Sequence, residues 1–113
     1  MITRTAVFEG TIRPGCEEAF FEAIRTRLAP LWRAFPHASN VRWLRMDERD
    51  AEAPPIVLIQ QIDYPSHAAL DEALASPARN AARAATLEIC EVFDGRFYHY
   101  VSEANAVEVG GRT

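Results

Sequence analysis

Hydrophobic and polar residues alternate over positions 2–12, which is the spacing of a β-strand. One face of this strand would carry Ile2, Ala6, Phe8 and Ile12. The opposite face would carry mainly polar and β-branched residues, namely Thr3, Thr5, Val7, Glu9 and Thr11. A period of two with β-branched side chains predicts an extended segment, and Pro14-Gly15 ends it.

The period changes to three and four residues over positions 17–35, which predicts a helix with one apolar stripe. The stripe consists of Phe20, Ile24, Leu28, Leu31 and Phe35. Acidic residues open the segment, where the helix dipole favours negative charge. Because proline lacks an N–H group and clashes with the preceding turn, we expect a kink or a new start at Pro30. Phe35-Pro36 should end the helix.

Two more strands and two more helices are predicted in the second half of the chain. Residues 41–46 and 56–63 favour strands, joined by a polar loop that ends in two prolines. Ser66 is a suitable N-cap for a short helix that reaches Ala75. Ser76-Pro77 then predicts the start of an alanine-rich helix, because proline is favoured at the first helical position.

The alanine-rich helix is expected to run over residues 78–93 and to stop at Asp94-Gly95. Its apolar stripe would carry Ala78, Ala82, Ala85, Ile89 and Phe93. Residues 96–102 predict the last strand. The small residues of this helix either let it approach the sheet closely or leave a cavity, and we expect a pocket near His99, Trp43 and the first helix.

The element order is strand, helix, strand, strand, helix, strand, which predicts a ferredoxin-like α+β fold. In that fold a four-stranded antiparallel sheet carries both helices on one face. The 113 residues fit one domain. We expect this domain over residues 1–103, followed by a small, polar C-terminal tail over residues 104–113.

The strands over 56–63 and 96–102 are apolar or aromatic on both faces, whereas a sheet with one face in water should alternate cleanly. The helices can cover only one face. Exposed apolar patches of more than a few hundred Å² mark interaction sites. We therefore predict a homodimer in which two such sheets face each other, which is a dimeric α/β barrel.

Charge and composition narrow the expected partners. The net charge is −4, and the twelve basic residues are all arginines without a dense run, which argues against a nucleic-acid or anionic-membrane partner. The first ten residues lack a signal-peptide pattern, and no apolar stretch approaches the ~20 residues that span a bilayer, so we expect a cytoplasmic protein. Cys16 and Cys90 share no metal-ligand spacing, and we expect reduced thiols and no metal site.

The chain resembles the dimeric α/β-barrel superfamily over residues 2–103. The resemblance rests on the element order, the length, the two-faced sheet, and the segment SPARNAARAATLEICEVFDGRFYHYV, which is similar to the second helix and closing strand of that superfamily. Its members include cofactor-independent antibiotic-biosynthesis monooxygenases, EthD-like and stress-responsive proteins, muconolactone isomerases and haem-binding relatives. The resemblance implies a shared fold, while these activities diverge widely.

His99 is the leading candidate for chemistry, because it shares a strand face with Phe97 and Val101. An imidazole with an ordinary pKa near 6.5 suits a general base. It also suits a haem ligand, or a hydrogen-bonded histidine of the core or dimer interface. Tyr98, its neighbour on the strand, is the second catalytic candidate.

Five further residues are candidates for substrate binding: Trp43, Tyr100, Glu9, Gln61 and Asn40. The two aromatic residues combine apolar bodies with polar tips, which suits a flat aromatic ligand and equally a dimer interface. The polar residues lie within or beside predicted strands, where they could contact a ligand or form a network between two sheets. Some monooxygenases of the superfamily use Asn, Trp and Tyr to place a polyphenol.

The sequence thus predicts a small cofactor-independent enzyme, monooxygenase-like or isomerase/cyclase-like, acting on a small hydrophobic or aromatic molecule. The alternatives are a non-catalytic dimeric module that binds a ligand in the same pocket, and a dimer whose polar residues are purely structural. Motifs for nucleotide binding, zinc proteolysis and serine hydrolysis are absent from the sequence, and no cofactor is expected.

Overall fold

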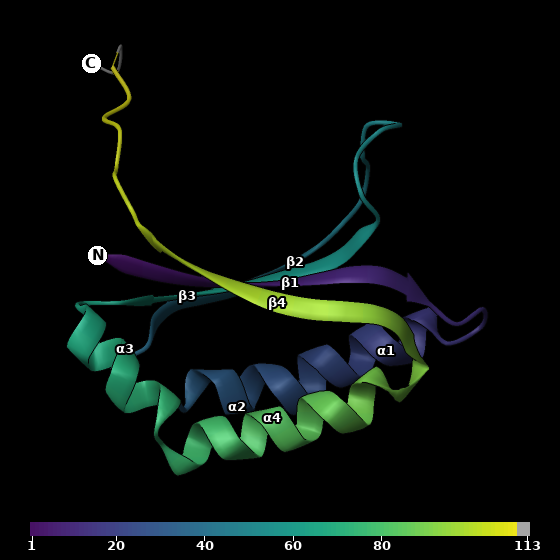
Figure 1. Cartoon of the computed structure of the whole chain (residues 1–113), viewed down its shortest axis with the longest axis horizontal. Helices are drawn as coiled ribbons and strands as arrows, with labels where there is room; N and C mark the ends of the chain where they lie inside the picture. The colour runs from purple at the N-terminus through teal and green to yellow at the C-terminus, as the bar shows by residue number, and fades with distance from the viewer. Residues whose placement is uncertain (111–113) are drawn as a thin grey trace.

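The computed structural model describes residues 1–110, whose four strands form one antiparallel sheet. These strands are β1 (Ile2–Ile12), β2 (Ser39–Arg45), β3 (Ile56–Tyr64) and β4 (Phe93–Glu103), in the spatial order β2-β3-β1-β4. Helices α1 (Glu17–Ala23), α2 (Ala29–Arg33) and α4 (Pro77–Ile89) lie along one face, and α3 (His67–Leu74) lies at its end on the same side (Figure 1). The predicted ferredoxin-like α+β fold is confirmed.

Strand pairing fixes which residues share a face of the sheet. Ala6 in the central strand β1 pairs with Gln60 of β3 and with His99 of β4, and Trp43 of β2 pairs with Gln60. These four residues form one row on the helix-facing side. The adjacent row, on the face without helices, consists of Arg42, Gln61, Thr5 and Tyr100. We call the face of the sheet that carries no helices the open face.

The predicted first helix is divided by a wide turn, η1 (Ile24–Leu28), between α1 and α2. Pro30 lies in the first turn of α2. Its missing N–H group cannot bond to the carbonyl four residues earlier, and the N–H of Ala29 instead reaches back five residues to Ile24. The expected new start near Pro30 is therefore confirmed, whereas α2 ends at Arg33, before Phe35-Pro36.

The predicted end of the last helix is wrong. Helix α4 ends at Ile89, a short turn η2 (Cys90–Val92) follows, and Asp94-Gly95 belongs to β4. The reason is the length of β1, which continues to Ile12 and pairs there with Phe93. Strand pairing thus places Phe93, Asp94 and Gly95 in the sheet, whereas local turn propensity assigned them to the end of a helix.

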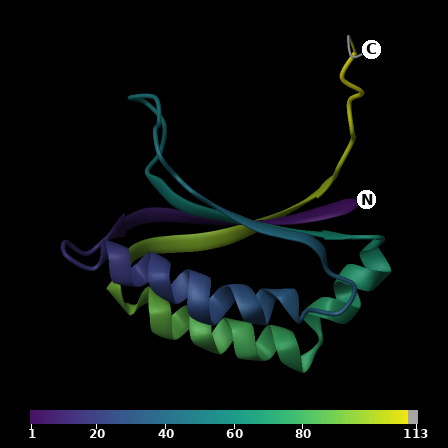
Figure 2. The same cartoon turned by 180° about the vertical axis from the view of Figure 1, so that it is seen from behind.

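The main core lies between the sheet and the helices. Its largest fully buried side chains are Tyr64, Phe20, Ile24, Leu28 and Leu58. The hairpin between β2 and β3 and the segment after β4 both project from the opposite side of the sheet (Figure 2). Residues 104–110 carry no helix or strand, and the predicted tail's last three residues lie outside the described residues. None of the helices within 1–110 has the length and apolarity needed to cross a membrane.

Candidate functional site

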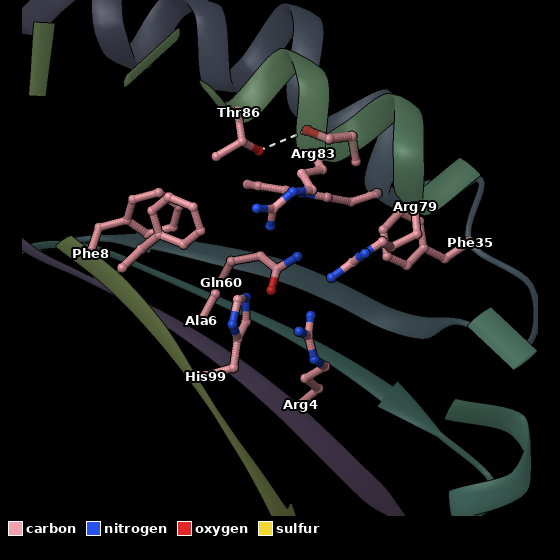
Figure 3. Close-up of a pocket in the computed structure, with 12 residues that line it drawn as sticks. Arg4, Ala6, Phe8, Phe35, Gln60, Arg79, Arg83, Thr86 and His99 are labelled. Carbon is pink, nitrogen blue, oxygen red and sulfur yellow. Dashed lines mark hydrogen bonds between the residues drawn. The ribbon is translucent and has the colours of Figure 1, made fainter. Parts of the chain in front are cut away.

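A small pocket opens between the sheet and α4, with a volume of about 60 Å³. The sheet contributes Arg4, Ala6, Phe8, Gln60, Phe97 and His99, and the helical layer contributes Trp32, Phe35, Arg79, Ala82, Arg83 and Thr86 (Figure 3). The small side chains of Ala6 and Ala82 line it and leave space between the layers. The volume exceeds the ~10–15 Å³ that one water needs, but pockets for drug-sized ligands run to ~300–1,000 Å³. It therefore suits a small polar group or one end of a ligand.

Two separate elements, β1 and α4, direct charged side chains into this pocket. Arg4 lies on the helix-facing side of β1, at a position two residues before Ala6. Arg79 and Arg83 are four residues apart on α4 and therefore project from the same side of that helix. The hydroxyl of Ser76 accepts the Arg79 backbone N–H at 3.3 Å, which fixes the first turn of α4.

The pocket has a strong excess of positive charge. In Figure 3 the nitrogen-bearing ends of Arg4, Arg79, Arg83 and His99 point into the same space between α4 and the sheet. Its lining contains no aspartate or glutamate. Within residues 1–110, other arginines form the ion pairs with carboxylates, and Arg4, Arg79 and Arg83 form none.

This environment keeps the His99 imidazole neutral. His99 is an exposed residue of the edge strand β4, but partial burial of its imidazole, together with the charges of Arg4, Arg79 and Arg83, lowers the pKa of His99 to about 4. Burial also lowers the pKa of Arg4, although a guanidinium stays charged. At neutral pH the pocket therefore combines three cations with one neutral, proton-accepting ring.

Trp43 shares the helix-facing row with His99 but not its pocket. The two residues lie on the opposite edge strands, about 14 Å apart at a strand spacing of ~4.8 Å. The Trp43 ring stacks on Phe21, with ring centroids 6.2 Å apart. The pocket thus contains the expected His99, together with Trp32 and Phe35 from the end of the predicted first helix. Trp43 instead packs against α1.

The other predicted site residues lie on the open face. Tyr98 donates a hydrogen bond to the Glu9 carboxylate at 2.8 Å, and that bond raises the pKa of Tyr98, so its hydroxyl stays protonated. The ring of Tyr100 packs edge-on against Tyr98, with ring centroids 5.7 Å apart. Gln61 donates to the Thr5 hydroxyl at 3.2 Å. The sheet therefore separates this group from His99.

Asn40 belongs to a polar cluster at one end of the open face. Its amide donates to Asp63 at 3.0 Å, and the Thr3 hydroxyl donates to the same carboxylate at 2.7 Å. Arg42 lies 3.6 Å from it. Asn40 also has a positive φ of 49°, a conformation that asparagine tolerates better than most residues. These contacts give Asn40 a structural environment away from the pocket.

Sequence reasoning missed the three pocket arginines. A signal was present for Arg4, because it interrupts the otherwise apolar, helix-facing positions of its strand. Arg79 and Arg83 carried a weaker signal, since paired arginines on a helix usually face water. Their approach to Arg4 and His99 depends on how α4 packs on the sheet, which a local pattern does not contain.

No family model and no curated protein matches this chain. Solved structures do match it over nearly its whole length. An EthD family protein from Bacillus halodurans is 19% identical with a TM-score of 0.71, and the alignment covers 93% of this chain and 99% of that one. A DABB family protein with a ferredoxin-like fold, from Mesorhizobium loti, is 13% identical with a TM-score of 0.69, and the alignment covers 93% and 97%.

A third similar structure is SnoaB, a cofactor-independent oxygenase from Streptomyces nogalater. It is 22% identical with a TM-score of 0.58, and the alignment covers 94% of each chain. At these identities the similarity shows the fold, and it confirms the resemblance to EthD-like and antibiotic-biosynthesis monooxygenase structures at that level.

Proposed function

We propose that this chain is a cofactor-independent enzyme of the monooxygenase type that acts on a small hydroxylated aromatic molecule, with His99 as the general base. The observation that carries the proposal is a neutral imidazole on the wall of a pocket that also offers aromatic side chains and three cations. The fold is shared with SnoaB, a cofactor-independent oxygenase, which supports the same class of chemistry.

The proposed reaction begins with a proton transfer. A neutral His99 accepts a proton from an acidic C–H of the substrate, and the guanidinium groups of Arg4 and Arg79 stabilise the anion that forms. The anion then supplies electrons to O₂. One oxygen atom replaces two hydrogens of a CH₂ group to give a carbonyl, and the other oxygen leaves as water with those two hydrogens.

The test measures oxygen consumption by the purified protein with a panel of hydroxylated aromatic compounds, without added flavin, metal or nicotinamide. His99→Asn should lower turnover by about 100-fold or more, while binding persists as quenching of Trp32 fluorescence in the pocket. His67→Asn, at the exposed start of α3, is the matched control. Rearranged product without oxygen uptake would assign an isomerase. Binding without turnover of any compound would overturn the enzyme proposal in favour of a binding module.

We further propose that the chain functions as a homodimer through its open face. Leu44, Val7, Ile59 and Tyr98 form an apolar row there, and Tyr100 beside it is 60% exposed. The β2–β3 hairpin and the segment after β4 rise on either side of this surface (Figures 1 and 2). In a dimer the Glu9–Tyr98 pair and Gln61 would lie between the two sheets.

Native mass spectrometry tests the dimer and reports any bound small molecule in the same experiment. A dimeric mass that Tyr100→Arg converts to a monomer supports the open-face interface, because the substitution buries an unpaired charge. Leu87→Arg, at an exposed position of α4, is the control and should leave the dimer intact. A monomer at micromolar concentration would overturn the proposal.

A further inference from the structure

We propose that the ligand of the pocket is an aromatic acid, that its carboxylate binds against Arg4, Arg79 and Arg83, and that this negative charge makes His99 a stronger base only when the ligand is present. The base role of His99 rests on the proposed function above. The anion site stands on the geometry of the arginines alone.

Charge is the first argument for the anion. Three guanidinium groups from β1 and α4 face one space, and no acidic side chain lines it. The charges of Arg4 and Arg79 raise each other's free energy, and salt screens them weakly because both residues are half-buried, whereas Arg83 is exposed. Of the described arginines, most of those outside the pocket pair with a carboxylate. A cluster without such a partner is best explained by an anion that comes from outside the chain.

Size and lining indicate the kind of anion. A volume of about 60 Å³ accepts a carboxylate, whereas an apolar cavity that holds benzene measures ~150 Å³. Guanidinium groups match the planar, two-oxygen geometry of a carboxylate. Phe97 lies on the pocket wall and is only half-buried, so it offers apolar surface for an attached ring, whereas Phe8 and Trp32 are buried. The acid group therefore enters the pocket, and the ring lies against Phe97.

The bound carboxylate would change the chemistry of His99. The charged groups that face the imidazole are Arg4 on β1 and Arg79 and Arg83 on α4; Gln60 on β3 and the lining from the α2 side are uncharged. The charges of the three arginines add to the effect of burial and lower the pKa of His99 to about 4. The free imidazole is therefore a weak base. A carboxylate beside the arginines offsets that effect and moves the pKa back toward its ordinary value near 6.5. The substrate thus strengthens the base that acts on it.

Benzoate and benzamide are a matched pair of probes, because they share a ring and differ in charge. Binding is measured by calorimetry. The His99 pKa is measured by NMR titration of the imidazole carbons, assigned with His99→Asn. Benzoate should bind at least about tenfold more tightly than benzamide, and it should raise the pKa of His99 by about one unit or more. The imidazole signals of His37 and His67, which lie outside the pocket lining, provide the comparison within the same spectrum.

Arg79→Gln and Arg83→Gln should each weaken benzoate binding by about tenfold and leave benzamide binding unchanged. Arg33→Gln removes the same charge from an exposed position of α2 outside the pocket lining and is the control. Circular dichroism and thermal unfolding establish that each variant is folded.

Equal binding of benzoate and benzamide, or benzoate binding that survives both arginine substitutions, would overturn the anion site. A fixed His99 pKa in saturating benzoate would overturn the coupling. Selective benzoate binding without any turnover would leave the anion site standing while the proposed enzyme activity fails. Turnover of neutral phenols without benzoate binding would leave the proposed enzyme activity standing while the anion site fails.

Discussion

The Asp63 carboxylate links three segments of the chain, so its replacement by asparagine should lower stability measurably. Asp63 is 8% exposed on the open face. It accepts hydrogen bonds from Thr3 at 2.7 Å and from Asn40 at 3.0 Å. In Asp63→Asn the new carbonyl oxygen can still accept from Thr3, but the new amide nitrogen would face the Asn40 amide, which is also a donor.

The variant therefore loses about one hydrogen bond to a charged acceptor, worth about 1.5–3 kcal/mol. The attraction of Arg42 adds little, because its side chain is partly exposed and lies 3.6 Å away. A loss near 2 kcal/mol corresponds to a decrease of roughly 8 °C in Tm for a domain of this size. Urea unfolding at pH 7 measures the difference, and Asp47→Asn in the exposed β2–β3 loop is the control for charge alone.

The stability difference between wild type and Asp63→Asn should become smaller as the pH falls. Burial by itself would raise the pKa of Asp63, but hydrogen bonds from Thr3 and Asn40 and the charge of Arg42 outweigh it and lower the pKa below 3.8. The stabilisation is therefore complete above the unfolded-state pKa and is lost as the pH falls through the lower folded-state value. The difference between wild type and Asp63→Asn should shrink below pH 4. Equal stability at pH 7, or a difference that grows with acidity, would refute the reasoning.

Three further substitutions test the core and the sheet. Tyr64→Phe should keep or raise the free energy of unfolding by about 1 kcal/mol, because within the described residues its buried hydroxyl has no hydrogen-bond partner; a clear loss in thermal unfolding would contradict this. Gly95→Ala should prevent stable folding, seen by circular dichroism, because its Cβ would meet the β1 backbone at 2.2 Å, whereas Gly110→Ala meets nothing within 4 Å. Leu58→Ala should cost about 2–5 kcal/mol in urea unfolding because Leu58 is fully buried, and Leu87→Ala, 53% exposed, should cost less than about 0.5 kcal/mol.

The sequence by itself determined the order of the elements and which residues of a strand share a face. Side chains alternate strictly along a strand, so the pattern was sufficient to place Ala6 and Phe8 on the same face. Pro30 likewise marked the break in the first helical segment, because its missing N–H group acts locally. Such features depend on neighbours within about five positions, and local chemistry is enough to predict them.

Tertiary structure alone decided which polar residues meet. The sequence predicted a pocket near both His99 and Trp43, but the order β2-β3-β1-β4 put them on opposite edges of the sheet. The same order put His99 next to β1, where Arg4 from the other end of the chain lies, and packing of α4 brought Arg79 above them. Because these contacts arise from strand pairing and helix packing between distant segments, no spacing in the sequence records them.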